Sequence, residues 1–407
     1  MSRVGRDETA RPGDASARYR LAAVVFVVLL AQVLLYPGID TLVATFGAET
    51  SLNASMWFLA TEFIAFVVFA APWGAVSDTT GRRVPFIVLG AGLGAVGYVL
   101  LAIVPNVLDL GFTGVLAIRF FQGAATIGAF SLALTMLMDL GGGHGRNMGA
   151  AGIAIGLGTA LGAPLGGQLY EVAPVVPLVT SAVLLVLVGV LAWTIRDHHP
   201  GDRRNRLREV VAGLRARPSL GVPYAFGFID RLTAGFFALV GTLYFRTVFH
   251  LSPGMTGLML ALFFAPFALL QYPFGRLSDR IGRTIPIVLG SGLYGIGVIG
   301  VGLAPDVPWA GVGLVAVGVL GAFMAPATMA LVTDLAEASE RGVAMGGFNI
   351  FGSLGFLVGI LGGGTVAERY GFTEAFLFAG GLEVVLAFAA LPVFLRMDPD
   401  IGAVFDR

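Results

Sequence analysis

The sequence predicts an all-α integral membrane protein whose twelve transmembrane helices form two pseudo-symmetric six-helix bundles. The first observation is composition, since 57% of the 407 residues are hydrophobic and only 12% are charged. Soluble domains average about 45–50% apolar and about 25% charged residues. The second observation is a series of twelve apolar runs, and the third is a set of motifs that recurs in both halves of the chain.

Composition also excludes several classes of protein. The chain has no cysteine, and all 25 of its basic residues are arginine rather than lysine. Disulfides, thiolate metal sites, P-loop ATPases and lysine-imine enzymes are therefore excluded. The four histidines lack zincin spacing, and a net charge of zero gives no footprint for nucleic acid. We expect no enzymatic activity, no metal and no cofactor.

Each apolar run is long enough to cross a bilayer, because about 20 helical residues span a hydrocarbon core of about 30 Å. The run after residue 20 could be a signal-peptide core, but no small-residue cleavage pattern follows it, so we predict a retained helix. The predicted spans are 21–40, 54–74, 84–104, 110–138, 146–170, 174–195, 221–249, 254–275, 284–304, 308–333, 342–366 and 372–395.

The arginines set the predicted orientation. They concentrate before the first span, in the connector between the sixth and seventh spans, and in the loops on the same side of the membrane. The positive-inside rule then places both termini in the cytoplasm. The expected organisation is an N-terminal tail (1–20), a first bundle (21–195), a cytoplasmic linker (196–220), a second bundle (221–395) and a C-terminal tail (396–407).

Several motifs recur in the same order in both halves. PWGAVSDTTGRR (72–83) matches PFGRLSDRIGR (273–283), and IVLGAGLGAVG (87–97) matches IVLGSGLYGIG (287–297). Further along, Asp139-Leu140 mirrors Asp334-Leu335, and glycines at four-residue steps recur in the fifth and eleventh spans. We infer a tandem duplication of a six-helix unit.

These motifs resemble those of the major facilitator superfamily along nearly the whole chain. The two Gly-x-x-x-Asp-x-x-Gly-Arg loops resemble its motif A, RFFQG (119–123) its motif B, and GTALGAPLGG (158–167) the motif C of drug:proton antiporters. Thr79 and Thr80 stand where the N-terminal motif A often has an arginine, and Ala163 separates a Gly and a Pro that are usually adjacent. The resemblance implies a secondary transporter that works by alternating access.

The duplicated loops predict a cytoplasmic gate closed by ion pairs. Their acids can neutralise the nearby helix ends, while their arginines face headgroups or carboxylates. The alternative is that they only mark the topology. The gate residues are Gly74, Asp78, Gly81, Arg82, Arg83, Asp139, Arg146, Gly275, Asp279, Gly282, Arg283, Asp334 and Arg341.

The glycine rows predict close helix packing, because lipid gives helices no hydrophobic reason to associate and small residues let backbones approach. Pro164 adds a bend. The packing and hinge residues are Gly158, Gly162, Pro164, Gly166, Gly355, Gly359 and Gly363.

Charges found in one half only predict the coupling site, because a mid-bilayer charge costs about 2.5–3.5 kcal/mol and a shared scaffold does not explain it. In the repeat register Glu62 corresponds to Phe263, and Arg119 corresponds to Leu314. The resemblance associates Arg119 with proton coupling. The candidate proton-coupling acids, in order of preference, are Asp230, Glu62 and Asp40. Arg119 and Arg231 are the candidate arginines beside them. Glu383 ranks below these acids, because the resemblance implies that the last helix is peripheral. For each acid the alternative is a structural ion pair.

The other polar or aromatic residues of the central spans are candidates for a largely apolar substrate cavity, namely Gln32, Tyr36, Gln122, Thr126, Tyr244, Gln271, Met324 and Asn349. Such a cavity suits lipophilic compounds. We therefore expect proton-coupled efflux of small hydrophobic or amphipathic molecules. An uptake symporter or uniporter for a metabolite, a lipid flippase and a transport-dead sensor are the alternatives.

The expected partners are a small-molecule substrate, protons and membrane lipids, with the proton gradient as the energy source. We expect a monomer in a prokaryotic plasma membrane.

Overall fold

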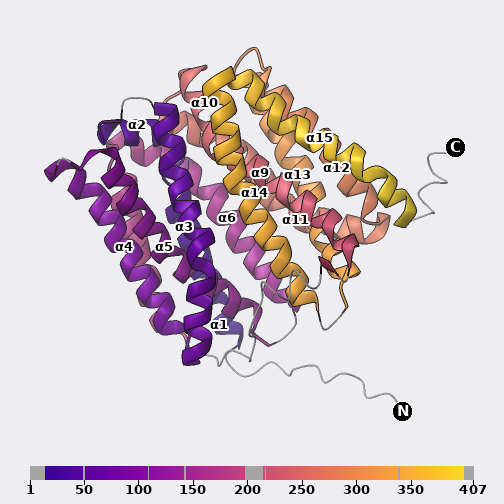
Figure 1. The fold of residues 1–407 in the computed structure, drawn as a ribbon, viewed down its shortest axis with the longest axis horizontal. Coiled ribbons are helices and arrows are strands. Elements are labelled where there is room, and N and C mark those ends of the chain that lie inside the picture. The colour runs from indigo at the N-terminus through magenta and orange to yellow at the C-terminus, as the bar shows by residue number, and fades with distance from the viewer. Residues whose placement is uncertain are drawn as a thin grey trace. The chain divides into compact units, whose positions relative to one another are not determined.

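A computed structural model describes residues 14–48, 51–108, 110–141, 144–197, 214–215, 217–337 and 340–397. These residues include twelve helices that are long and apolar enough to cross a membrane, so the predicted number of spans is confirmed (Figure 1). No strand occurs among them. The all-α prediction is therefore confirmed as well.

The chain forms two compact units, which we describe separately. Unit 1 comprises residues 1–203 with 252–258, and unit 2 comprises residues 204–251 with 259–407. The predicted linker at 196–220 and both predicted tails lie largely outside the described residues.

Within the described residues before 198, unit 1 has one short helix and six long ones, and the first residues of α11 (Pro253–Ile281) also belong to it. Helix α1 packs against α5, α6 and α7, while α4 packs against α5 and α7, and α3 against α5. The helices are α1 (Asp14–Val33), α2 (Ile39–Thr45), α3 (Ser51–Thr80), α4 (Val84–Val107), α5 (Gly111–Met138), α6 (His144–Val172) and α7 (Val176–Trp193).

The first predicted span differs from the structure at both ends. Helix α1 begins at Asp14, ends at Val33 and is followed by the separate short helix α2. Between them lies Pro37, which lacks a backbone N–H, followed by Gly38. A Cβ on Gly38 would lie 2.6 Å from the Tyr170 ring, so only glycine fits there. The Tyr170 hydroxyl donates to the Leu35 carbonyl at 2.9 Å and fixes this break.

Unit 2 contains the remaining long helices. The seventh span, predicted as one helix, is interrupted by a π-helical turn at Phe237–Gly241, where the Thr242 hydroxyl bonds to the Ala238 carbonyl at 3.2 Å. After a short 3-10 turn (Pro218–Leu220) come α9 (Gly221–Phe236), α10 (Thr242–Thr247), α11 (Pro253–Ile281), α12 (Thr284–Gly302), α13 (Val307–Leu335), α14 (Arg341–Tyr370) and α15 (Phe372–Met397).

The glycine rows lie where the structure brings two helices closest. A Cβ on Gly158 would lie 2.9 Å from the Phe26 carbonyl of α1, and one on Gly162 would lie 2.7 Å from Val33. In unit 2, Cβ atoms on Gly355 and Gly359 would collide with α9 carbonyls. Gly166 approaches Leu34, Gly363 approaches Phe236, and Pro164 lies inside α6.

Candidate functional site

A buried ion pair lies at the centre of unit 1. The Arg119 Nη2 atom on α5 is 2.7 Å from the Glu62 Oε2 atom on α3, and both side chains have 0% relative exposure. Two helices that the sequence places far apart thus supply complementary charges at one depth. Each charge is compensated by the other, since a lone charge in this environment would be expensive.

A helical ladder on α5 extends the ion pair. Arg119, Gln122 and Thr126 occupy one helix face because they are three and four residues apart. Arg119 donates from Nη1 to the Gln122 Oε1 atom at 2.7 Å, and Gln122 donates from Nε2 to the Thr126 hydroxyl at 2.8 Å. The Gln122 amide also reaches the Glu62 Oε1 atom at 3.4 Å. This series of hydrogen bonds therefore connects the Glu62–Arg119 ion pair to the polar side chains of Gln122 and Thr126 on α5.

Aromatic rings surround the guanidinium. The Arg119 Cζ atom lies 4.6 Å from the centre of the Phe58 ring and 5.8 Å from that of Tyr98. Cation–π attraction adds to the ion pair at such distances. The Tyr98 hydroxyl is buried beside Arg119 and Gln122, and no hydrogen bond of ideal geometry engages it or the Arg119 Nε atom among the described residues. The site therefore keeps unused polar capacity beside the pair.

Small residues allow this close assembly. A Cβ on Gly123 would lie 3.0 Å from the Glu62 carbonyl, and one on Gly97 of α4 would lie 2.5 Å from the Gln122 Cβ. In unit 2 the same crossing brings Gly318 against the Phe263 carbonyl. Phe263 and Leu314 fill the positions of Glu62 and Arg119 there, and both are buried. The repeated crossing carries charge in one unit and apolar side chains in the other.

Other candidates of unit 1 lie beside the pair or outside it. Gln32 and Tyr36 are buried next to the Glu62 carboxylate. Asp40 lies in the first turn of α2, is half-buried and has an interaction partner. Gln32, Gln122, Thr126 and Tyr36, predicted as cavity residues, thus belong to one polar neighbourhood with Glu62.

The charged candidates of unit 2 lie together on α9. Asp230 and Arg231 are both half-buried. The Arg231 side chain runs along α14, where a Cβ on Gly352 would lie 3.1 Å from its Cγ atom. Asp230 is an electrostatic neighbour of Arg231 on its own helix and of Glu383 on α15.

Glu383, which the sequence places below the other acids as a proton carrier, is a buried group. Its rank as a proton carrier stays a prediction. Its side chain has 0% exposure, and the Ser291 hydroxyl of α12 lies 2.6 Å from its Oε2 atom. The Thr233 hydroxyl of α9 lies 3.5 Å from its Oε1 atom. Although α15 exposes one side, Glu383 faces the interior of unit 2.

The remaining cavity candidates of unit 2 have different environments. Tyr244 is buried in an aromatic cluster, and its hydroxyl lies 3.4 Å from the Val301 and Gly302 carbonyls. Met324 is buried within a hydrophobic core of this unit. Gln271 is half-buried, and Asn349 is exposed. Their predicted contact with substrate stays a prediction.

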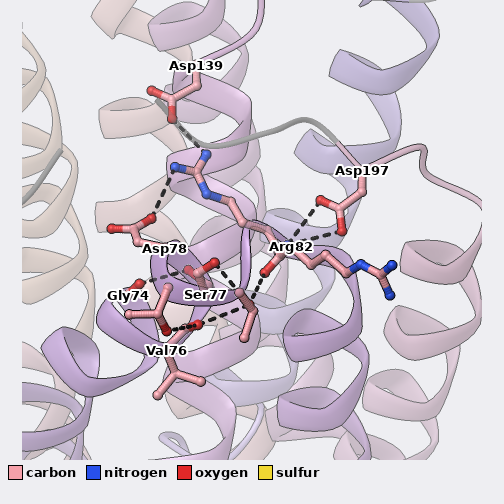
Figure 2. A network of polar contacts seen from close by, with 10 residues as sticks. Gly74, Val76, Ser77, Asp78, Arg82, Asp139 and Asp197 are labelled. Atoms are coloured by element: carbon pink, nitrogen blue, oxygen red, sulfur yellow. Dashed lines mark hydrogen bonds and ion pairs between the residues drawn. The ribbon is translucent and has the colours of Figure 1, made fainter. Parts of the chain in front are cut away.

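Arg83 organises the N-terminal duplicated loop. Figure 2 shows Asp78, Asp139 and Asp197, the three acids of this network. The Arg83 Nη1 atom lies 2.7 Å from the Asp139 carboxylate, and its Nη2 atom lies 3.8 Å from that of Asp78. The Arg83 backbone N–H also donates to the Asp197 carboxylate at 3.0 Å. Through these three contacts Arg83 connects the ends of α3, α5 and α7, and its side chain is only 3% exposed.

The C-terminal loop repeats this arrangement in unit 2. Arg283 donates to the Asp279 carboxylate at 2.6 Å, to Asp334 at 3.1 Å and to the Ser278 hydroxyl at 2.8 Å. Partial burial lowers the pKa of Arg283, but hydrogen bonds to Asp279 and Asp334 outweigh it, so this pKa lies above its ordinary value.

Arg83, rather than Arg82, is therefore the structural counterpart of Arg283. Arg82 is exposed, although it follows the motif glycine as Arg283 does. The repeat resumes with IVLG at Ile87 and at Ile287, a register that pairs Arg83 with Arg283. The threonines at 79 and 80 do not disrupt the network, since both hydroxyls bond to the Val76 carbonyl.

The other gate candidates have separate positions. Arg341 donates from Nε to the Thr333 carbonyl at 3.1 Å, at the end of α13, while Arg146 is exposed. Gly81 and Gly282 adopt positive φ angles of 66° and 85°, which glycine accommodates without strain. Gly74 lies inside α3 and Gly275 inside α11. The gate role of these residues stays a prediction.

One buried arginine was not anticipated. Arg18 of α1 donates from Nε to the Asn147 side chain at 2.6 Å and from Nη2 to the Gly141 carbonyl at 2.7 Å. Asn147 in turn donates to the Leu140 carbonyl at 2.6 Å. In the sequence Arg18 is one of the arginines before the first predicted span, which indicate only the orientation. Nothing in its sequence neighbourhood indicates this long-range contact.

No group of three or more histidines, cysteines or carboxylates able to hold a metal ion occurs within the described part of the chain. The polar chemistry of both units is instead that of buried carboxyls with arginine, amide or hydroxyl neighbours. Such groups can bind and release protons.

The chain is similar to known transport proteins along most of its length. The family model of the Major Facilitator Superfamily matches residues 21–242 and 224–405. Multidrug resistance protein 2 of Bacillus subtilis is 33% identical over 144 residues, which cover 35% of this chain and 36% of that protein. Multidrug resistance protein MdtG of Enterobacter lignolyticus is 31% identical over 357 residues, which cover 84% of each chain.

A solved structure shares the fold. A bacterial homologue of the human lysosomal transporter Spinster, in an inward-facing and occupied conformation, superimposes with a TM-score of 0.78 at 14% identity, covering 95% of this chain and 98% of that one. The family assignment rests on the match to MdtG over 84% of each chain and on the two matches of the family model. The chain belongs to the Major Facilitator Superfamily and is a secondary transporter.

Proposed function

We propose that this transporter is a proton-coupled exporter of small hydrophobic or amphipathic compounds, and that Glu62 is its coupling acid. The observation that carries the proposal is the fully buried Glu62–Arg119 pair inside unit 1. Glu62 combines an arginine partner at 2.7 Å with a side chain that has no exposed surface, whereas Asp230 and Asp40 are only half-buried. The geometry therefore favours it over Asp230 and Asp40.

The pair has two states that differ by one proton. With Glu62 ionised, the two charges neutralise each other in a medium that solvates neither. With Glu62 protonated, Arg119 keeps its charge, because a guanidinium does not lose its proton in proteins. The Arg119 charge is then stabilised only by the side-chain amide oxygen of Gln122 and by the rings of Phe58 and Tyr98. Protonation thus changes the electrostatic energy of unit 1 and can bias its conformation.

The energy of one proton is sufficient for useful accumulation. One charge moving through about 100 mV releases about 2.3 kcal/mol. Because about 1.4 kcal/mol corresponds to a factor of ten, this supports a gradient of roughly 50-fold for an uncharged substrate, while the exchange of a monovalent cation for one proton is driven by the pH gradient alone. ATP hydrolysis by a P-loop is excluded, because the Walker A motif requires a lysine and the chain has none.

Two observations support the proposed substrate class. The cavity candidates form a short polar list in a chain that is 57% hydrophobic, and an apolar site with few polar groups suits lipophilic molecules. Two relatives, in Bacillus subtilis and Enterobacter lignolyticus, are named multidrug resistance proteins.

The test uses the full chain in proteoliposomes with an imposed pH gradient and a fluorescent lipophilic cation as probe. We expect the probe to move toward the more acidic compartment, against the direction of proton flow. Movement with the protons would indicate a symporter, and movement that ignores the gradient would indicate a uniporter. Either result would overturn the proposed export.

Two variants make the test specific for the coupling acid. Glu62→Gln removes the titrating group while keeping a similar shape, and it should abolish the pH-driven movement. Glu374→Gln removes an exposed acid of α15 and should leave the movement unchanged. Lipid scrambling without proton movement in the unaltered protein would favour the flippase.

A further inference from the structure

Glu383 occupies an enclosed position in unit 2. Helices α12 and α15 cross at Gly295 and Gly380, where each glycine faces the carbonyl of the other. A Cβ on Gly295 would lie 2.8 Å from the Glu383 Cβ atom. The crossing therefore holds the Glu383 carboxyl, with 0% exposure, against α12.

The neighbours of this carboxyl are hydroxyl groups and another acid. The Ser291 and Thr233 hydroxyls lie 2.6 and 3.5 Å from its two oxygens. Two charged or titratable neighbours act on it electrostatically, Asp230 from α9 and Tyr294 from α12. Helix α14, which also packs on α15, carries its charges only at its ends, at Arg341, Glu368 and Arg369. No ion pair of Glu383 occurs in the described part of the chain.

A buried carboxylate without a cation is far more costly than a carboxylic acid. Such groups bind a proton rather than remain ionised. The hydroxyls are compatible with this state, since each can accept the acid proton as well as donate its own. The two carboxyls therefore differ in their surroundings. Asp230 has a positive charge beside it, that of Arg231, whereas the neighbours of Glu383 are neutral groups and an acid.

We propose that Glu383 is a second proton-binding residue, which holds a proton in this structure and exchanges it with Asp230 through the Thr233 hydroxyl. The inference rests on the proposed proton coupling and adds a site in the other unit to the one at Glu62. The two acids share one proton, and Glu383 is its favoured position because Asp230 has the cationic Arg231 next to it on α9, whereas the hydrogen-bond partners of Glu383 are hydroxyl groups.

The route follows one face of α9. Asp230 and Thr233 are three residues apart, so their side chains lie on the same face one turn from each other. In the transfer, Glu383 gives its proton to the Thr233 oxygen while Thr233 gives its own hydroxyl proton to the Asp230 carboxylate. One O–H bond breaks and one forms at each step, and the total charge is unchanged. Asp230 is half-buried, so it is the more exposed of the two acids.

The experiment is infrared difference spectroscopy of the full chain in lipid membranes, titrated with base in a choline chloride buffer without any transport substrate. The signal is the C=O stretch of a protonated carboxyl, which disappears on ionisation. We expect a band in the unaltered protein that is lost in Glu383→Gln and retained in Glu374→Gln and Glu62→Gln.

Two further variants test the neighbours. Ser291→Ala removes a hydrogen bond to the acid and should shift the band without abolishing it, which remains informative if Glu383→Gln fails to fold. Asp230→Asn removes a nearby negative charge, so ionisation of Glu383 becomes easier and the band should disappear at a lower pH than in the unaltered protein.

Three results would overturn the inference. The first is a protonated-carboxyl signal that is identical in the unaltered protein, Glu383→Gln and Ser291→Ala. The second is a Glu383 titration that Asp230→Asn does not move. The third is loss of the band when sodium replaces choline at constant pH, which would identify a cation site. Because no substrate is present, these results are independent of whether the proposed export is correct.

Discussion

Glu62 and Arg119 respond differently to the loss of their partner. A carboxyl without its arginine can take up a proton and become neutral, whereas a guanidinium without its carboxylate stays charged. Removing one member of a buried pair typically costs about 3–5 kcal/mol because it leaves an uncompensated charge. For this pair the cost should therefore depend on which member is removed.

We predict that Glu62→Gln destabilises the protein by about 3–5 kcal/mol, and that Arg119→Leu destabilises it less. Arg119→Leu should also become more stable as the pH falls, because protonation removes the unpaired charge. Thermal midpoints in detergent across a pH series provide the measurement. Equal losses in both variants at low pH would show that the pair is not an isolated buried ion pair.

Arg82 and Arg83 are adjacent, but only Arg83 is buried and paired. Its hydrogen bonds to charged groups are worth about 1.5–3 kcal/mol each where buried, and less here because Asp78 and Asp139 are about one-third exposed. We predict that Arg83→Ala lowers stability by about 1–2 kcal/mol, while Arg82→Ala changes it by less than about 0.5 kcal/mol.

Thermal unfolding of the two single variants, measured side by side, checks this assignment. A larger loss in Arg82→Ala would place the structural role on the residue that the motif alignment suggests. The same comparison is informative in unit 2, where Arg283→Ala should behave as Arg83→Ala does.

At this scale the sequence identified residues better than partnerships. Glu62, Arg119 and Gln122 were all predicted to matter, but their hydrogen bonds join α3 to α5 and follow from packing that no local pattern contains. The Arg83–Asp197 contact joins positions that are 114 residues apart in the sequence. Glu383 was ranked low from the general position of its helix, although the face on which it lies is what decides its burial.

Glycines on one helix of unit 2 have opposite surroundings. A Cβ on Gly359 would collide with the Leu232 carbonyl of α9, whereas a Cβ on Gly346 would meet nothing within 4 Å. Alanine is otherwise preferred to glycine in a helix by about 1 kcal/mol. The two positions therefore separate helix propensity from helix packing.

We predict that Gly359→Ala lowers the thermal midpoint, while Gly346→Ala leaves it unchanged or raises it. The expected loss at Gly359 is about 1–3 kcal/mol, the usual cost of overpacking a close contact. Equal behaviour of the two variants would mean that α14 and α9 do not pack through this glycine row.

The number of helices was predictable because each span must satisfy its backbone hydrogen bonds within an apolar run. Their ends were less so. The break at Pro37-Gly38 and the π-helical turn at Phe237–Gly241 both interrupt runs that remain apolar, so hydropathy does not register them. The first depends on the contact of Gly38 with Tyr170, which only the folded unit contains.

The two units of the molecule share a scaffold and differ in charge. Both have an arginine that binds the acid of the duplicated loop and the acid at the end of a neighbouring helix. Both have a glycine that brings two helices together at the positions of Glu62 and Phe263. The shared features account for architecture, and the unshared acids account for the proposed coupling.

We propose that Glu62 links proton movement to substrate movement. Proteoliposomes at equal pH on both sides, with an internal pH indicator and an outward or inward gradient of a lipophilic cation, test this link. We expect the substrate gradient to drive protons in the opposite direction in the unaltered protein. In Glu62→Gln, exchange of labelled for unlabelled substrate should continue while the pH signal is lost. Undiminished proton movement in Glu62→Gln would show that Glu62 is not the coupling acid.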